Sequence, residues 1–173
     1  MTTNRTILLT GRPGSGKTTL IRHVLARLAG PAGGFYTQEI REAGRRMGFE
    51  IITLDGGRGI LAHVDISSKH RISKYGVDLS ALETFAIPAM LDAVEHHKLV
   101  VIDEIGPMEL LSPEFRQVVL DILGSSASVL GSIVWRSTPF TDQIKSRPDV
   151  TLLEVTPENR EELFEVILEL VEH

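Results

Sequence analysis

Residues Gly11–Thr18 read GRPGSGKT and follow a short apolar run, Arg5–Thr10, whose letters are RTILLT. The run predicts a β-strand over about residues 5–10, and the apolar spacing after the loop predicts a helix over about residues 16–29. A strand, a loop of the form G-x-x-x-x-G-K-[ST] and a helix in this order are typical of a phosphate-binding loop. The alternative is a glycine-rich turn with a surface lysine, which the flanking strand and helix disfavour.

Each position of this loop has a physical reason. The glycines permit backbone conformations that residues with a side chain rarely adopt, so successive N–H groups can face one anion at the start of a helix. Lys17 can act as a catalytic cation on the β- and γ-phosphates, and the Thr18 hydroxyl can ligate Mg²⁺. The predicted nucleotide-binding residues are Gly11, Arg12, Pro13, Gly14, Ser15, Gly16, Lys17, Thr18 and Thr19.

Length and composition predict one domain, which we expect to span residues 1–173. The hydrophobic fraction of 42% is ordinary, and no apolar run approaches the roughly 18 residues that a membrane-spanning helix needs. The sequence has no cysteine, which excludes disulfides and thiolate chemistry. The first residues lead directly into the first strand and leave no room for a signal peptide, so we expect a cytoplasmic protein.

The formal net charge of −5 argues against broad nucleic-acid binding, which depends on many contacts from lysine and arginine to phosphates. The one dense basic cluster, Arg41, Arg45 and Arg46, is expected at the solvated tip of a hairpin. We expect no membrane partner and a monomeric protein.

Strand-like and helix-like segments alternate along most of the chain. Buried strands are expected at residues 98–103 (KLVVID), 127–134 (ASVLGSIV) and 150–155. Pairs of a capping residue and a proline predict helix starts at Ser112-Pro113, Thr138-Pro139 and Thr156-Pro157. This alternation predicts an α/β fold of three layers around a mostly parallel sheet.

One segment departs from the alternation. Strand-like runs at Phe35–Ile40, Met47–Leu54 and Ile60–Val64 are joined by the turn-prone letters REAGRR and DGGRG. They predict an antiparallel hairpin or meander, inserted around residues 35–64.

A further helix is expected after this segment. Asp78 or Ser80 can cap it, and its apolar face reaches about His97. Pro88 lies inside the pattern and is expected to break or kink the helix.

Residues 100–104 read VVIDE, a hydrophobic strand that ends in two carboxylates. Ligands in such folds lie at the carboxyl ends of the strands, which brings Asp103 and Glu104 to the same edge as the glycine loop. Asp103 can hold Mg²⁺, and Glu104 can orient and deprotonate a water molecule for attack on the γ-phosphate. The second role requires Glu104 to lie just past the strand, because neighbouring strand residues face opposite sides. The alternative is a strand that ends in solvated acids.

Weaker candidates surround this pair. Arg136 lies just beyond the strand at 127–134 and is a candidate catalytic residue that stabilises transition-state charge, although an exposed arginine at a strand end is a common finding. Ser132 and Ser137 are candidate polar sensors of the γ-phosphate. Glu109 is either a carboxylate that supports the site or an acid at the start of a helix.

The sequence resembles the THEP1-type nucleoside-triphosphatase family, called the cancer-related nucleoside-triphosphatase family in animals. The similarity covers nearly the whole chain, and its middle segments are more specific than the loop. The segments that carry it are GRPGSGKT (11–18), GGFYTQEIREAGRRMGFEIITL (33–54), LAHVD (61–65), KYGVDL (74–79), IDEIGPMEL (102–110) and PENR (157–160).

The resemblance implies a RecA-like P-loop domain that hydrolyses nucleoside triphosphates, with tolerance of the base and a need for Mg²⁺. By position, residues 11–18 would bind phosphates, Asp103 would support Mg²⁺ and Glu104 would activate water. The chain departs from the family pattern at Pro107, where a lysine is common.

Three functions therefore stay open from the sequence. The first is hydrolysis of nucleoside triphosphates such as ATP and GTP, at a modest rate because no arginine is strongly placed by a motif. The second is a small kinase that transfers the γ-phosphoryl group to a small molecule, a nucleotide or a nucleic-acid end. The third is an accessory ATPase switch.

Overall fold

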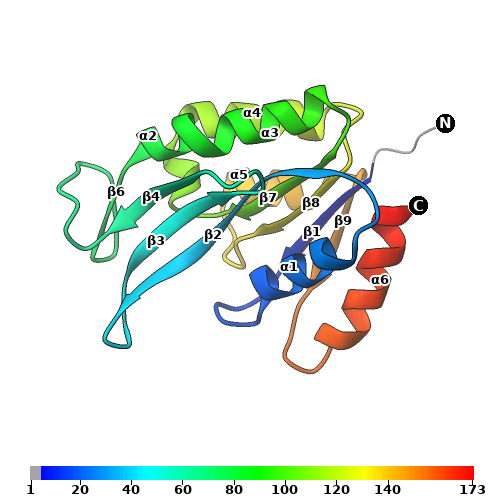
Figure 1. Cartoon of the computed structure of the whole chain (residues 1–173), viewed down its shortest axis with the longest axis horizontal. Helices are drawn as coiled ribbons and strands as arrows, with labels where there is room; N and C mark the ends of the chain where they lie inside the picture. Colours follow the sequence, from blue (N-terminus) through cyan, green and yellow to red (C-terminus); the bar gives the residue numbers. More distant parts are fainter. Residues whose placement is uncertain (1–4) are drawn as a thin grey trace.

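The computed structural model describes residues 5–173 of the chain (Figure 1). The first strand, β1 (Thr6–Thr10), leads into the glycine loop, and the helix α1 (Lys17–Arg27) follows it. Both elements were expected from the sequence, with the helix two residues shorter at its end. The part of the expected domain and of the expected N-terminal segment that falls on residues 1–4 lies outside the described residues.

The described strands form one mixed sheet of nine, in the order β5-β6-β4-β3-β2-β7-β8-β1-β9. Neighbours among β2, β7, β8, β1 and β9 run parallel, whereas β3, β4, β6 and β5 extend the sheet by antiparallel pairing. The other strands are β2 (Ala32–Glu42), β3 (Arg45–Thr53), β4 (Arg58–His63), β5 (Arg71–Ile72), β6 (Tyr75–Val77), β7 (Leu99–Ile105), β8 (Val129–Ile133) and β9 (Val150–Glu154).

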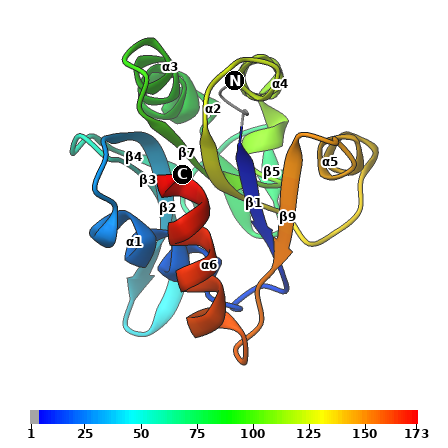
Figure 2. The ribbon, with the colours of Figure 1, turned by 90° about the vertical axis from the view of Figure 1, so that its right-hand side faces the viewer.

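Helices cover both faces of this sheet and make three layers (Figure 2). One face carries α1 and α6, and the other carries α3, α4 and α5. The remaining helical segments are α2 (Leu79–Ala81), the π-helical turn η1 (Leu82–Ala86), α3 (Ile87–Glu95), the 3-10 turn η2 (Glu109–Leu111), α4 (Pro113–Leu123), α5 (Pro139–Lys145) and α6 (Arg160–Glu172). The α/β class predicted from the alternation is confirmed.

Two apolar clusters fill the spaces between the layers. Alternate residues of β1 face opposite sides, so Leu8 belongs to the cluster under α3 and α4, whereas Ile7 and Leu9 belong to the one under α1 and α6. In the larger cluster, the rings of Phe35 and Phe115 are 6.0 Å apart and meet edge to face. No helix in the described range is long and apolar enough to cross a membrane.

The segment around residues 35–64 pairs antiparallel as expected, and it extends one side of the sheet. Its first strand, β2, begins at Ala32 and pairs in parallel with β7 up to the pair of Tyr36 with Asp103, so it belongs to the parallel part as well. The strand expected from Phe35 begins earlier, at Ala32, because the glycines before Phe35 allow a close approach of backbones. A Cβ on Gly34 would lie 2.1 Å from the carbonyl oxygen of Val101.

The expected caps start two of the helices. The Ser112 hydroxyl accepts a hydrogen bond from the N–H of Phe115 at the start of α4, and Thr138 forms a reciprocal capping pair with Thr141 at the start of α5. Each cap satisfies N–H groups that have no partner inside the helix.

The helix start expected at Thr156-Pro157 is wrong. The N–H of Thr156 donates to Oδ1 of Asn159 at 2.8 Å, so these residues form a turn, and α6 begins at Arg160. A side chain that pairs with a nearby backbone group competes with helix formation, and this pairing delays the helix by one turn.

The helical segment expected from about residue 78 begins with Asp78, which accepts from the N–H of Ser80, and it continues past Pro88 without a break. A π-helical turn ends at Ala86, two residues before the proline, and the N–H of Ile87 bonds to the carbonyl of Leu82, five residues back. Proline lacks an N–H and its ring crowds the carbonyl four residues earlier, which the wider turn accommodates.

We expect Gly34→Ala to lower the free energy of unfolding by about 3 kcal/mol, because Gly34 has a φ of 106° and the new Cβ would meet the Val101 backbone. Gly44→Ala is the matched control, since Gly44 has a φ of 79° but open space around it, and it should cost only about 1 kcal/mol. Urea unfolding of the two variants measures the difference. Equal losses would show that β2 and β7 can separate to admit a methyl group.

Candidate functional site

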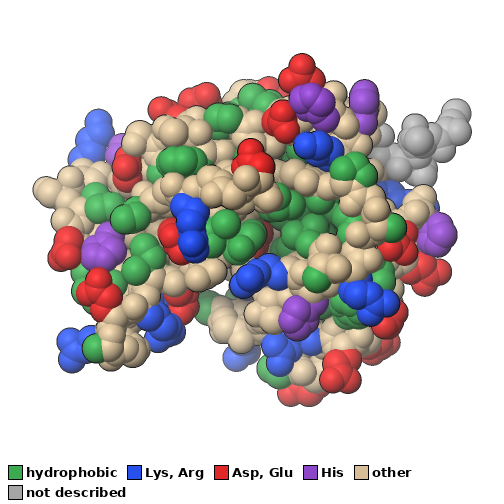
Figure 3. Space-filling model, in the orientation of Figure 1, with side chains coloured by type: hydrophobic (Ala, Val, Ile, Leu, Met, Phe, Trp, Pro, Cys, Tyr) green, Lys and Arg blue, Asp and Glu red, His purple; other side chains and the backbone are tan. Residues whose placement is uncertain are grey.

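A cleft opens at the carboxyl ends of the parallel strands, with a volume of about 700 Å³. We call it the central cleft. Figure 3 shows a hollow between the projecting tip of β2 and β3, at lower left, and the body of the molecule. Its lining residues are Pro13, Gly14, Gly16, Lys17, Thr18, Thr19, Arg22, Tyr36, Thr37, Gln38, Glu39, Arg41, Arg46, Phe49, Asp103, Glu104 and Arg160.

The glycine loop forms one wall of the central cleft. Gly14 and Gly16 have φ values of 81° and 96°, in the left-handed region that favours glycine. The Lys17 ammonium group donates to the carbonyl oxygen of Gly11 at 2.9 Å, so the lysine folds back across the loop. Six of the nine predicted nucleotide-binding residues line the cleft, from Pro13 to Thr19 without Ser15, whereas Arg12 is exposed and lies outside it.

Asp103 lies inside the parallel sheet, in β7. It is buried, and its Oδ1 accepts a hydrogen bond from the hydroxyl of Ser132 in the neighbouring strand β8. Burial raises the pKa of Asp103, while the hydroxyls of Ser132 and Thr18 and the charge of Lys17 oppose that rise. Ser132, a candidate sensor of the γ-phosphate, therefore donates to the Asp103 carboxylate and is not among the residues that line the cleft.

The predicted role of Glu104 required it to lie just past the end of β7. The strand instead continues to Ile105, so Glu104 lies within it. The pairing of β7 with β8 is instead irregular between Ile102 and Ile105, so the simple alternation of sides is interrupted there. Asp103 and Glu104 consequently both line the central cleft. Burial and the neighbouring Asp103 raise the pKa of Glu104, and Lys17 opposes them.

Polar atoms without partners gather at this edge of the sheet. Within residues 5–173, the buried side-chain atoms that lack a hydrogen bond are Thr10 Oγ1, Ser15 Oγ and Asp103 Oδ2. All three belong to the glycine loop or to the ends of the strands beside it. A buried polar atom without a partner costs free energy, so the arrangement favours a ligand that supplies partners.

The arginines of the cleft differ from the predicted one. Arg136 is exposed and is not among the residues that line the cleft. Arg160, at the start of α6, lines it instead, and a Cβ on Gly16 would lie 2.6 Å from Nη1 of its guanidinium group. Sequence reasoning missed Arg160 because the approach of α6 to the loop is a tertiary contact. The segment PENR was a signal of it, but only through the family resemblance.

The opposite wall of the cleft comes from β2 and β3. Arg41 and Arg46, expected at a solvated hairpin tip, line the cleft and both pair with Glu39, at 2.7 and 3.3 Å. The guanidinium group of Arg22, in α1, lies 5.0 Å from the centre of the Tyr36 ring, which belongs to β2. The central cleft is therefore rich in positive charge on both sides, which favours an anionic ligand.

Glu109 lies behind the two carboxylates. It is buried in the turn η2 and lines a small cavity of about 180 Å³ together with Glu104 and Pro107. Burial raises the pKa of Glu109 well above its usual range, and the charge of Glu104 raises it further. The structure thus places Glu109 next to Glu104, as a buried acid at the start of the turn η2.

Fold and site together define a class: three-layer α/β proteins with a glycine loop and paired acids at the carboxyl edge of a parallel sheet. A family model described as NTPase matches residues 6–168. The nucleoside-triphosphatase THEP1 of a Thermotoga species (strain RQ2) is 50% identical over 165 residues, which cover 95% of this chain and 94% of that protein. The human cancer-related nucleoside-triphosphatase is 40% identical, with 97% of each chain covered.

Solved structures agree with these sequence matches. The crystal structure of THEP1 from the hyperthermophile Aquifex aeolicus has a TM-score of 0.90 and 39% identity, and 98% of this chain and 99% of that chain are covered. The chain belongs to the NTPase family that includes the THEP1 proteins and the human cancer-related nucleoside-triphosphatase. The family resemblance seen in the sequence is confirmed.

We expect Glu109→Gln to make the free energy of unfolding less dependent on pH. Glu109 has a pKa raised in the folded state above its ordinary value of 4.5, so its contribution to stability is fully present below about pH 4.5 and is lost as the pH rises through the folded-state pKa. Glutamine cannot ionise, so wild type should lose stability relative to the variant over this range. Denaturant unfolding at a series of pH values measures it, with Glu169→Gln, at an exposed position of α6, as control. Parallel curves for wild type and Glu109→Gln would contradict the assignment.

Proposed function

We propose that the protein is a nucleoside-triphosphatase that hydrolyses ATP, GTP and other nucleoside triphosphates to the diphosphate and phosphate. The observation that carries this proposal is the meeting of Lys17, Asp103 and Glu104 in one positively charged cleft. Curated members of its family carry the name nucleoside-triphosphatase. The glycine loop, with helices on both faces of the sheet, supports a RecA-like P-loop domain as the finer class of the fold.

In this proposal the loop binds the phosphates through its backbone N–H groups at the start of α1. Lys17 would exchange its contact with the Gly11 carbonyl for the β- and γ-phosphates. Glu104 would take a proton from the attacking water, whose oxygen forms a bond to the γ-phosphorus while the bond to the β-phosphate oxygen breaks. Nucleoside diphosphate and phosphate then leave, and Glu104 releases the proton to water.

Mg²⁺ fits the donors of the central cleft. Asp103 Oδ2 is a buried carboxylate oxygen without a hydrogen bond, and Thr18 lies close enough to lower the pKa of the same group. No cluster of three or more His, Cys, Asp or Glu that could hold a metal occurs among the described residues. This suits Mg²⁺, which is commonly held by one or two protein ligands together with substrate phosphates. When bound, it supplies neutralisation of the phosphate charge.

Arg160 is the arginine best placed to stabilise charge on the transferred group, and we propose it in place of Arg136. Its guanidinium group has no hydrogen bond or ion pair within the described chain, and it lies over Gly16 of the loop. An arginine held within the same chain gives slower turnover than one supplied by an activating partner. The expected modest rate, a monomer and a cytoplasmic location remain parts of the proposal.

A kinase is the second candidate, because one observation favours it. Arg41 and Arg46 line the cleft on the side opposite the loop, where an anionic acceptor could be held and water excluded. Hydrolysis needs no such wall. The accessory ATPase switch remains the third possibility and has no separate structural support.

We expect Glu104→Gln to keep the affinity for Mg·ATP while turnover falls by about 10²-fold or more, because the amide preserves shape but cannot accept the proton. Calorimetric titration and phosphate release measure the two properties. Lys17→Ala, which removes the loop cation, is the contrasting variant and should weaken binding itself. Loss of ATP binding in Glu104→Gln would mean that Glu104 holds the ligand rather than the water.

A phosphate-release assay with ATP, GTP, CTP and UTP should show Mg²⁺-dependent hydrolysis of all four, with Lys17→Ala as the blank. The reason is that every ligand of the proposal contacts phosphates, which the four substrates share. Adding labelled ATP and a panel of nucleoside, nucleotide and RNA-end acceptors separates the candidates. Label on an acceptor, with little free phosphate, would favour the kinase.

A further inference from the structure

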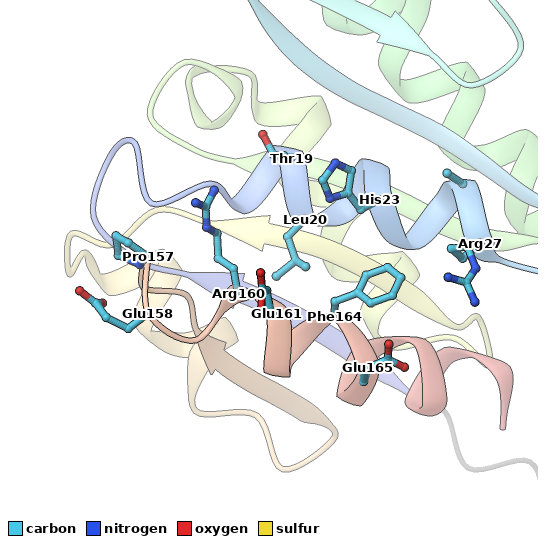
Figure 4. Close-up of a pocket in the computed structure, with 11 residues that line it drawn as sticks. Thr19, Leu20, His23, Arg27, Pro157, Glu158, Arg160, Glu161, Phe164 and Glu165 are labelled. Carbon is cyan, nitrogen blue, oxygen red and sulfur yellow. The ribbon is translucent and has the colours of Figure 1, made fainter.

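A second hollow adjoins the central cleft, between α1 and α6 (Figure 4). Its volume is about 920 Å³, and we call it the α1–α6 groove. Leu20 and His23 line it from α1, and Pro157 and Phe164 line it from the turn before α6 and from α6 itself. In Figure 4 the Phe164 ring extends from α6 toward α1 and lies near His23.

The groove and the central cleft lie next to each other. Thr19 and Arg160 line both of them, and Arg160 lies over Gly16 in the glycine loop. A molecule whose phosphates lie against the loop can therefore extend past Thr19 and Arg160 into the groove without leaving the protein surface.

The two hollows differ in charge. The central cleft is lined by five basic side chains and three acids, so basic groups are in excess. The groove has the opposite balance, with Glu158, Glu161 and Glu165 against Arg27 and Arg160. Carboxylates repel phosphate but accept hydrogen bonds from hydroxyl groups. A ligand with a polyphosphate at one end and an uncharged, hydroxyl-bearing group at the other would be oriented by this difference.

Phe164 gives the groove a surface suited to a flat ring. The side chain is half-buried, and the Arg27 guanidinium lies 6.0 Å from the centre of its ring. His23 is exposed beside it and makes no hydrogen bond within residues 5–173. Aromatic and cationic groups of this kind stack on any nucleobase, because every base has a π-face.

We propose that the α1–α6 groove binds the nucleoside half of the substrate, with the base against Phe164 and the sugar beside Thr19, where the groove meets the central cleft. This inference rests on the proposed function, because it takes the phosphates to lie on the glycine loop. Recognition of the base is then by stacking rather than by hydrogen bonds to its edge. Such a site binds purine and pyrimidine nucleotides alike, and its selectivity comes from the polyphosphate rather than from the base.

The test compares two probes, ADP and inorganic pyrophosphate, by calorimetric titration in the presence of Mg²⁺. Only ADP has a nucleoside. Phe164→Leu keeps an apolar side chain but removes the ring, and it should weaken ADP binding by about tenfold while pyrophosphate binding is unchanged. Phe164→Tyr keeps the ring and should retain the affinity for ADP. GDP, CDP and UDP should lose affinity with Phe164→Leu to a similar extent.

Val166→Ala is the matched control, because Val166 is an exposed hydrophobic residue of α6 that does not line the groove. It should leave both affinities unchanged. The proposal is overturned if Phe164→Leu binds ADP as wild type does, or if ADP and pyrophosphate lose affinity equally. Failure of wild type to bind either probe would instead overturn the function proposed for the loop.

Discussion

A buried carboxyl group between two parallel strands is the constraint on which the site depends. Asp103 lies in β7 with one oxygen bonded to Ser132 of β8 and the other without a partner. Removing a carboxylate from water is costly unless nearby groups compensate for the lost hydration. The strands hold it at the mouth of the glycine loop because parallel strands end at a common edge. A cation held together with phosphate ligands would supply the missing partner of the second Asp103 oxygen.

The local features of the fold could be predicted from the sequence because they depend on neighbouring residues. The glycine loop, the caps at Ser112 and Thr138, and the buried strand before Asp103 all follow from short-range rules. Misassignments arose where a distant contact decided the outcome. The strand expected from Phe35 begins at Ala32, because the glycines before Phe35 permit β2 to approach β7.

The candidate site shows the same division. Lys17, Thr18, Asp103 and Glu104 meet in the central cleft, as motif spacing alone indicated. The arginine could not be predicted, because the sequence does not say which helix packs beside the glycine loop. Arg136 follows a strand of the parallel sheet, which made it attractive, but Arg160 reaches Gly16 only through the packing of α6 on the other side. The irregular pairing that lets Glu104 share the cleft with Asp103 likewise leaves no trace in the letters VVIDE.

The double membership of β2 has a mechanical consequence. The same strand pairs with β7 beside Asp103 and continues outward as one arm of the hairpin that carries Arg41. The hairpin is thus a continuation of the hydrogen-bonded sheet. It cannot rotate as a rigid body about a loop without breaking backbone hydrogen bonds between β2 and β7, close to Asp103. Any closer contact of this wall with a ligand must come from rotation of the long arginine side chains, while the backbone of β2 and β3 keeps its position.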